Sequence, residues 1–96
     1  MTAVSADLAA RRGWQQDGMI VLLDLLASTT ATDTPPIPWA VLTVGALLGR
    51  AGHPDQVAAW AKHLDTRAVR TPCADGTTAL RCDAVWRAVP VTVVCA

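Results

Sequence analysis

Apolar residues recur at near-helical spacing through the first part of the chain and predict an N-terminal helix. The positions that carry this pattern are Leu8, Trp14, Met19, Leu22, Leu23 and Leu26. Ser5 or Asp7 is expected to cap the helix, because such side chains accept hydrogen bonds from its first backbone N–H groups. Gly13 and Gly18 lower the helix propensity in the middle, so the segment is either one kinked helix or two helices.

The most apolar part of this segment, Met19–Leu26, is expected to face the core, with Asp24 on its outer side. The residues that follow, "ASTTATDTPP", are rich in turn-forming and helix-breaking types. They predict a polar linker between the first helix and the next apolar segment.

A second apolar run, "PPIPWAVLTVGALLGR", occupies residues 35–50. Its uninterrupted part, from Pro38 to Leu48, is too short for a membrane helix, which needs about 20 apolar residues. The prolines keep the chain extended on entry, and apolar residues follow on both parities of a strand. We therefore expect a central strand from about Trp39 to Leu48, with a curl or bulge at Gly45 left open as an alternative for its end.

The stretch "HPDQVAAWAKHL" predicts a second helix. Pro54 suits the first helical position, and the Asp55 carboxylate suits the positive end of the helix dipole. One apolar face follows at helical spacing and consists of Val57, Trp60, Ala61 and Leu64.

The stretch "TRAVRTPCADGTTALRCDAVW" predicts a β-hairpin with Asp75–Gly76 at the centre of a two-residue turn. This turn sets the register of the two strands. The cross-strand pairs that follow from it are Val69 with Cys82, Thr71 with Leu80, and Arg70 with Arg81. A register slipped by one residue would pair Val69 with Arg81 and is disfavoured, because it mixes apolar and charged positions.

The last stretch, "VPVTVVCA", alternates apolar residues and predicts a final strand that begins at an edge or just past a turn, because of Pro90. The expected fold class is α+β, in one domain that spans residues 1–96. An N-terminal helix, a central strand and a second helix precede a three-stranded antiparallel meander. Both helices pack on one face of the small sheet.

The pattern "LLDLLAS…PPIPWAVLTVGALLGR", followed by "AAWAKHL" and a short hairpin, covers most of the chain. In this pattern the chain resembles small uncharacterised α+β proteins of GC-rich Gram-positive bacteria and of their phages or mobile elements. The resemblance implies a phage or mobile-element context. It includes no catalytic motif, so it implies no activity.

The composition favours a partner. The hydrophobic fraction of 52% is high and the charged fraction of 17% is low, so a chain of 96 residues is expected to leave apolar surface open. The formal net charge of zero argues against a general polyanion binder and against a polybasic membrane surface, and it gives little repulsion between copies. We expect another protein or a second copy as the partner, with a homodimer favoured, and no membrane.

The cysteines and histidines give no catalytic or metal-binding pattern. Cys73, Cys82 and Cys95 are odd in number and lack the close pairing of a zinc site, which fits reduced thiols in a cytoplasm. Cys82 and Cys95 lie on the inward strand parity, and Cys73 is the best candidate for an exposed thiol. His53 and His63 each lie two residues from an aspartate, a spacing that does not share a helix face. We expect no metal and no cofactor, and a thiol or histidine enzyme is the least favoured function.

Two pairs of residues remain as candidate binding sites. Trp39 and Trp86 are the interface candidates, because large aromatic side chains anchor interfaces and these two lie on strands that could lack a covering helix. Arg70 and Arg81 are the anion-binding candidates, because two facing guanidinium groups near Asp83 suit phosphate oxygens. The favoured function is a non-enzymatic protein-interaction or assembly module that self-associates. Nucleic-acid or phosphate-ligand binding through the arginine-bearing hairpin is the alternative.

Overall fold

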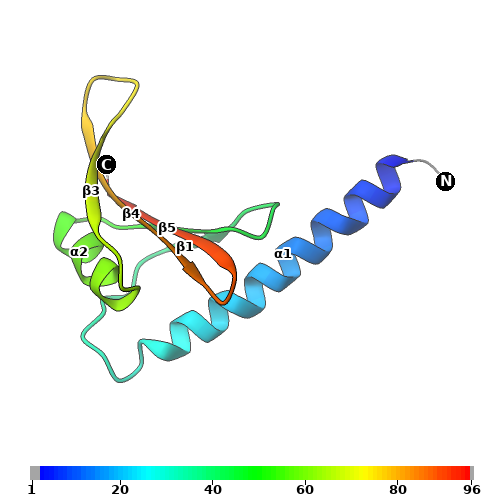
Figure 1. Ribbon diagram of the computed structural model, residues 1–96, viewed down its shortest axis with the longest axis horizontal. Helices are drawn as coiled ribbons and strands as arrows, with labels where there is room; N and C mark the ends of the chain where they lie inside the picture. The colour runs from blue at the N-terminus through cyan, green and yellow to red at the C-terminus, as the bar shows by residue number, and fades with distance from the viewer. Residues whose placement is uncertain (1–2, 96) are drawn as a thin grey trace.

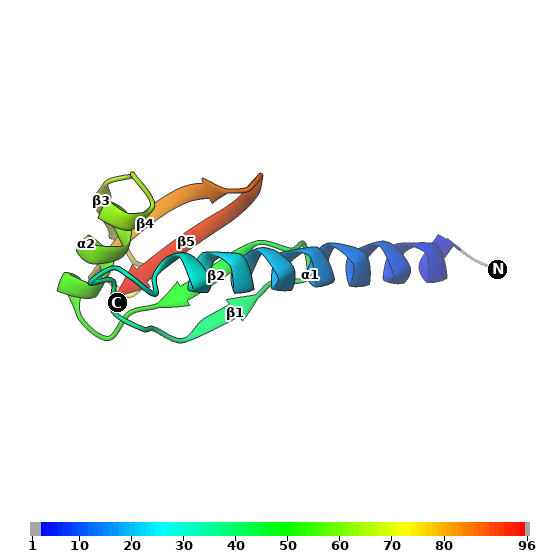
Figure 2. The same ribbon diagram turned by 90° about the horizontal axis from the view of Figure 1, so that it is seen from below.

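The protein is a five-stranded mixed sheet covered by two helices on one face (Figures 1 and 2). The computed structural model describes residues 3–95. The elements in chain order are α1 (Ala3–Ser28), β1 (Trp39–Val41), β2 (Leu47–Arg50), α2 (Pro54–His63), β3 (Ala68–Pro72), β4 (Thr78–Trp86) and β5 (Val89–Cys95). The strand order is β1-β2-β5-β4-β3, so the α+β class and the helices on one face are confirmed.

The expected central strand over Trp39–Leu48 is wrong, because the apolar run folds back on itself as the β1–β2 hairpin. The Leu42 N–H donates to the Ala46 carbonyl at 2.8 Å, and Gly45 adopts a φ of +85° that favours glycine. β2 then pairs in parallel with β5, which becomes the central strand. The alternative of a curl or bulge at Gly45 thus identified the place where the chain turns.

The antiparallel meander of β3, β4 and β5 is confirmed, but the expected hairpin register is wrong by one residue. The loop contains three residues instead of two, since the Cys73 N–H donates to the Thr77 carbonyl and Gly76 has a φ of +85°. A type I turn followed by a left-handed glycine is the usual three-residue hairpin loop. The pairs are therefore Val69 with Arg81 and Arg70 with Leu80.

The core lies between α2 and the inner face of the sheet. The apolar face expected on α2 is confirmed, since Val57, Trp60, Ala61 and Leu64 are all buried. The His53 imidazole caps this helix by accepting a hydrogen bond from the Asp55 backbone N–H at 3.1 Å. The residues that meet this face from the rest of the molecule are Leu25, Leu47, Cys82, Val91, Val93 and Cys95.

The first helix is continuous through Gly13 and Gly18, so the alternative of two helices is wrong. It begins at Ala3, before both expected caps, which lie inside it. Its 26 residues make a rod of about 39 Å, and its N-terminal half projects beyond the sheet in both ribbon views (Figures 1 and 2). The radius of gyration of 14.9 Å exceeds the value of about 12.5 Å expected for a compact chain of this length.

Candidate interaction surface

Helix α1 crosses the β1–β2 turn at a contact between two glycines. A Cβ atom at Gly18 would collide with the Gly45 carbonyl oxygen and lie 2.9 Å from Val41 Cγ1. A Cβ atom at Gly45 would lie 2.5 Å from the Trp14 carbonyl oxygen. Gly18, which lowers helix propensity, is therefore the residue that lets the helix backbone touch the turn.

Hydrogen bonds hold α1 to the sheet at two further places, one near its middle and one in its C-terminal half. Gln15 Nε2 donates to the Val41 carbonyl at 3.2 Å on β1. The Asp24 carboxylate accepts the Trp86 indole N–H at 2.9 Å and the Arg87 Nε–H at 2.5 Å from the β4–β5 end of the sheet. The hydrogen bonds from Trp86 and then from Arg87 lower the pKa of Asp24. Asp24, expected on an outer side, thus anchors the helix to the sheet.

The last turn of α1 is tied to the last turn of α2. Ser28 Oγ lies 2.8 Å from His63 Nε2, and the imidazole stacks on Trp86 with ring centroids 5.9 Å apart. The same imidazole meets the edge of Trp60. These contacts fix the C-terminal end of α1. At the other end of the helix, residues 8–12 are all exposed.

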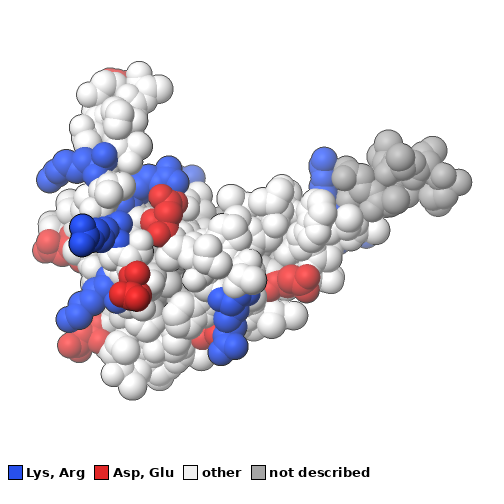
Figure 3. Space-filling view, in the orientation of Figure 1, with Lys and Arg blue, Asp and Glu red and all other residues white. Residues whose placement is uncertain are grey.

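The side of α1 that faces away from the sheet carries a row of large apolar side chains, which we call the free stripe. Its members are Leu8, Met19, Ile20, Leu23 and Leu26. Ile20 and Leu23 are the most exposed, at 66% and 69%. In Figure 3 most of the charged side chains lie over the compact body, and a few more lie along the projecting helix.

The free stripe lies on one side of the helix and the core-facing residues lie on the other. Residues seven or eleven positions apart return to nearly the same side of an α-helix, which aligns Leu8, Met19 and Leu26. Gly18 and Leu25 each precede a member of this row by one residue, so they lie about 100° around the helix from it, and both are buried. The expectation that all of Met19–Leu26 faces the core is therefore wrong. Within Met19–Leu26 only Asp24 is polar, so apolar residues occur on more than one side of the helix, which was the sequence signal for a second apolar face.

Trp14, on α1, is the most exposed of the four tryptophans, with 48% of its surface open to solvent. It borders a shallow depression of about 190 Å³ between the helix, the β1–β2 turn and the β4–β5 turn. Val44, at 65% exposure, lies on the same rim. Sequence reasoning placed Trp14 only in the helical pattern. It did not predict the β1–β2 turn, which brings Val44 beside Trp14.

Trp39 and Trp86 do not lie on an uncovered sheet face, contrary to the reason for choosing them. Trp39 packs edge-on against Trp60 with ring centroids 5.0 Å apart, and Trp86 is bonded to Asp24. Both side chains are half-buried against the core. Trp39 also covers Gly49, where a Cβ atom would lie 3.0 Å from the indole ring. Their position makes them part of the fold, and an interface role for them stays a prediction.

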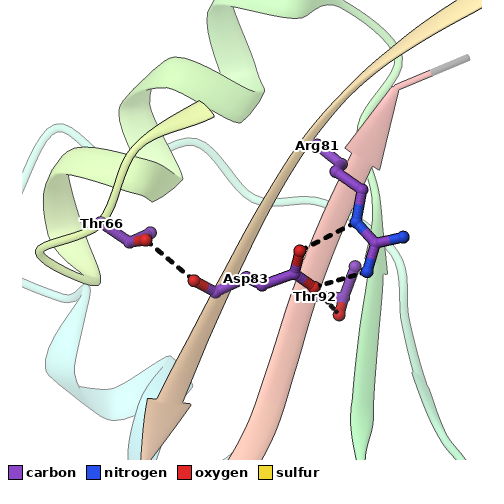
Figure 4. A network of polar contacts seen from close by, with 4 residues as sticks. All are labelled: Thr66, Arg81, Asp83 and Thr92. Carbon is purple, nitrogen blue, oxygen red and sulfur yellow. Dashed lines mark hydrogen bonds and ion pairs between the residues drawn. The ribbon is translucent and has the colours of Figure 1, made fainter. Parts of the chain in front are cut away.

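Arg70 and Arg81 are not cross-strand partners, because the hairpin register places them on opposite faces of the sheet. The Arg81 guanidinium instead donates two hydrogen bonds to the Asp83 carboxylate, from Nε to Oδ2 at 2.9 Å and from Nη2 to Oδ1 at 2.7 Å (Figure 4). The Thr92 hydroxyl donates to the same carboxylate at 2.6 Å. The hydrogen bonds from Arg81 lower the pKa of Asp83 and raise the pKa of Arg81 itself.

The cysteines occupy the places expected for them. Cys82 and Cys95 are buried, and Cys73 beside the hairpin loop is the least buried of the three. Burial raises the pKa of the Cys82 thiol. Within the part of the chain that the structure describes, no three histidine, cysteine or aspartate side chains gather closely enough to hold a metal ion.

His63 borders a half-open cavity of about 480 Å³ that sequence reasoning missed. The cavity lies between the linker after α1 and the end of α2, and its lining consists of Thr32, Asp33, Thr34, Ala59, Lys62 and His63. No local spacing could have found it, because its two sides are distant in sequence. The His63 Nε2 atom is already engaged by Ser28, so the polar groups left to the cavity are two threonine hydroxyl groups, the Asp33 carboxylate and the Lys62 ammonium group.

Comparison with protein families, curated proteins and solved structures finds no match to this chain. Within residues 3–95, neither helix is both long enough and apolar enough to span a lipid bilayer. The interpretation of function therefore rests on the geometry, in which the free stripe of α1 is the most prominent exposed feature.

Proposed function

We propose that the protein is a non-enzymatic interaction module that self-associates through the free stripe of α1. The observation that carries the proposal is the exposure of five large apolar side chains along the side of α1 that faces away from the sheet. Four of them, Met19, Ile20, Leu23 and Leu26, lie within two helical turns and form one exposed apolar patch, a feature that often marks an interaction site on a monomer. A standard interface buries about 800 Å² of surface on each partner, and side chains beside the stripe can supply the remaining contact area.

The projecting half of α1 also favours a partner on energetic grounds. Short helices are marginal in water, and most helical stability in proteins comes from packing an apolar face. Residues 8–12 are all exposed, and a Cβ atom at Gly13 would meet nothing within 4 Å. This half of the helix therefore gains little from its own sheet and would gain from packing against another molecule.

A second copy of the chain fits this stripe better than a charged partner. A two-fold symmetric contact places the same patch on both sides, so an apolar stripe meets an apolar stripe. The formal net charge of zero adds little repulsion between copies. Cytoplasmic location belongs to the same proposal, supported by three cysteines that form no disulfide. The phage or mobile-element context that the resemblance implies also belongs to it.

The test is sedimentation velocity of the wild type and two variants from low to high micromolar concentration. Leu23→Lys keeps helix propensity but puts a charge into the stripe, so the dimer is expected to weaken at least tenfold, about 1.4 kcal/mol. Val85→Lys is the matched control, because Val85 on the sheet is as exposed, at 68%, and lies outside the stripe. A wild type that stays monomeric, or equal weakening by both variants, would contradict the proposal.

A further inference from the structure

The face of the sheet opposite the helices carries a row of arginines that the corrected registers bring together. Arg50 of β2 and Arg81 of β4 are both paired with Val94 of the central strand β5. Directly paired residues point to the same face of a sheet. Both arginine side chains therefore project from the uncovered face. The Cα atoms of the two arginines lie about 10 Å apart across β5. Figure 4 shows the Arg81 side chain on the side of the strands that faces away from α2.

One arginine of this row is fixed and its neighbours are free to bind. Asp83 holds Arg81 through its Nε and Nη2 atoms, which leaves the Nη1 side of the guanidinium open. Arg50 and Arg67 are exposed and have no ion pair to any carboxylate in residues 3–95. The β3 residue paired with Arg81 is Val69, and Arg67 lies two positions before it, just outside the strand. The neighbouring Thr66 hydroxyl donates to the Asp83 carbonyl at 2.8 Å. The row thus has three guanidinium groups and one carboxylate, an excess of positive charge.

The geometry points to the phosphodiester backbone of single-stranded nucleic acid as the ligand of this face, held by Arg50 and Arg81 with Arg67 at the end of the row. Guanidinium groups suit phosphate oxygens because they donate several hydrogen bonds in a fixed plane. The row runs across the strands, so a chain of phosphates can contact successive arginines. The cavity beside His63 and the depression beside Trp14 include none of these arginines, which disfavours a small phosphate compound that needs enclosure.

The recognition is expected to be independent of base sequence. No aromatic residue occurs among the paired strand positions of this face, so stacking platforms for bases are absent from the described strands. The apolar side chains of this face are aliphatic: Leu48 and Val94 are half-buried, and Val69 and Val85 are exposed. Affinity would come from the phosphates, and it should fall as salt rises because bound counterions are released. A local row of this kind is compatible with a chain whose formal net charge is zero.

The test is fluorescence anisotropy of a labelled oligothymidylate, titrated with the protein at low and at moderate salt. Arg50→Gln is the main variant, because Arg50 has no internal ion pair whose loss would disturb the fold. We expect it to weaken binding about threefold to tenfold and to lower the slope of log affinity against log salt by about one. Arg12→Gln is the control, since Arg12 is exposed on α1, away from the sheet, and should leave binding unchanged.

Asp83→Asn should strengthen binding of the oligonucleotide, in contrast to Arg50→Gln, because it removes the one carboxylate in the row. Equal affinity of wild type, Arg50→Gln and Arg12→Gln would overturn the inference, as would the lack of any anisotropy change at low salt. Inorganic phosphate forms a second arm. Binding of phosphate without binding of the oligonucleotide would also overturn it, because it would show an isolated anion site. The Leu23→Lys variant, in which self-association is weakened, should still bind the oligonucleotide as a monomer. This result would show that the arginine row and the self-association surface act independently.

Discussion

The backbone of Gly45 in the β1–β2 turn lies against Gly18 and the Trp14 carbonyl of α1, so closely that neither glycine has room for a Cβ atom. This contact sets the angle at which α1 leaves the sheet. It therefore decides which side of the helix is buried and which side becomes the free stripe.

Gly18→Ala should weaken the docking of α1 in spite of the better helix propensity of alanine. We expect the free energy of unfolding to fall by about 1–3 kcal/mol, because the new methyl group overlaps the Gly45 carbonyl and Val41. Gly13→Ala is the matched control. Nothing lies within 4 Å of its new Cβ atom, so it should gain about 1 kcal/mol from propensity alone. Urea unfolding of both variants measures the difference, and equal shifts would mean that the glycine contact does not constrain the helix.

The β4–β5 turn offers a second test, because Arg87 and Ala88 adopt positive φ values of 48° and 65° without being glycine. The left-handed conformation costs a residue that has a Cβ atom about 1–2 kcal/mol. Ala88→Gly should therefore raise the midpoint of urea unfolding. Ala84→Gly, within β4, should lower it, since glycine costs entropy in a strand. A loss of stability in Ala88→Gly would show that the alanine methyl group contributes more than the strain it causes.

Stability should fall in acid through the paired carboxylates of Asp24 and Asp83. The pKa of each is lower in the folded protein than its ordinary value of 3.8, mainly because of hydrogen bonds from Trp86 to Asp24 and from Arg81 to Asp83. Their contribution is therefore complete above the ordinary pKa and is lost as the pH falls through the folded pKa. Urea unfolding between neutral pH and pH values below 3.8 measures this loss. Asp83→Asn should lower stability at neutral pH and flatten the acid limb, and an unchanged limb would refute the assignment.

Thiol chemistry should separate the three cysteines. A disulfide reagent is expected to label Cys73 at the hairpin loop first, because Cys82 and Cys95 are buried in the core. Burial also raises the pKa of Cys82, which lowers its reactive thiolate fraction at neutral pH. Cys73→Ser should remove the fast phase and leave the slow phase, which depends on unfolding. A fast phase that survives in this variant would mean that a core cysteine is accessible.

The sequence by itself determined the elements whose signals are local. The apolar face of α2 was readable, because Val57, Trp60, Ala61 and Leu64 repeat at helical spacing after a proline at the first turn. The antiparallel meander was readable as well, since alternating residues flank an Asp75–Gly76 turn signal. The inward parity of Cys82 followed from the same alternation.

Only the tertiary structure decided the features that depend on which surfaces meet. The register of the β3–β4 hairpin depended on one additional loop residue, which moved Arg70 away from Arg81. The pairing of β5 with both β2 and β4 brings Arg81 into one row with Arg50. The apolar pattern of α1 could not say which side is buried, because both sides are apolar. The Gly18–Gly45 contact made that choice, since a helix packs on the side where its backbone can approach the sheet most closely.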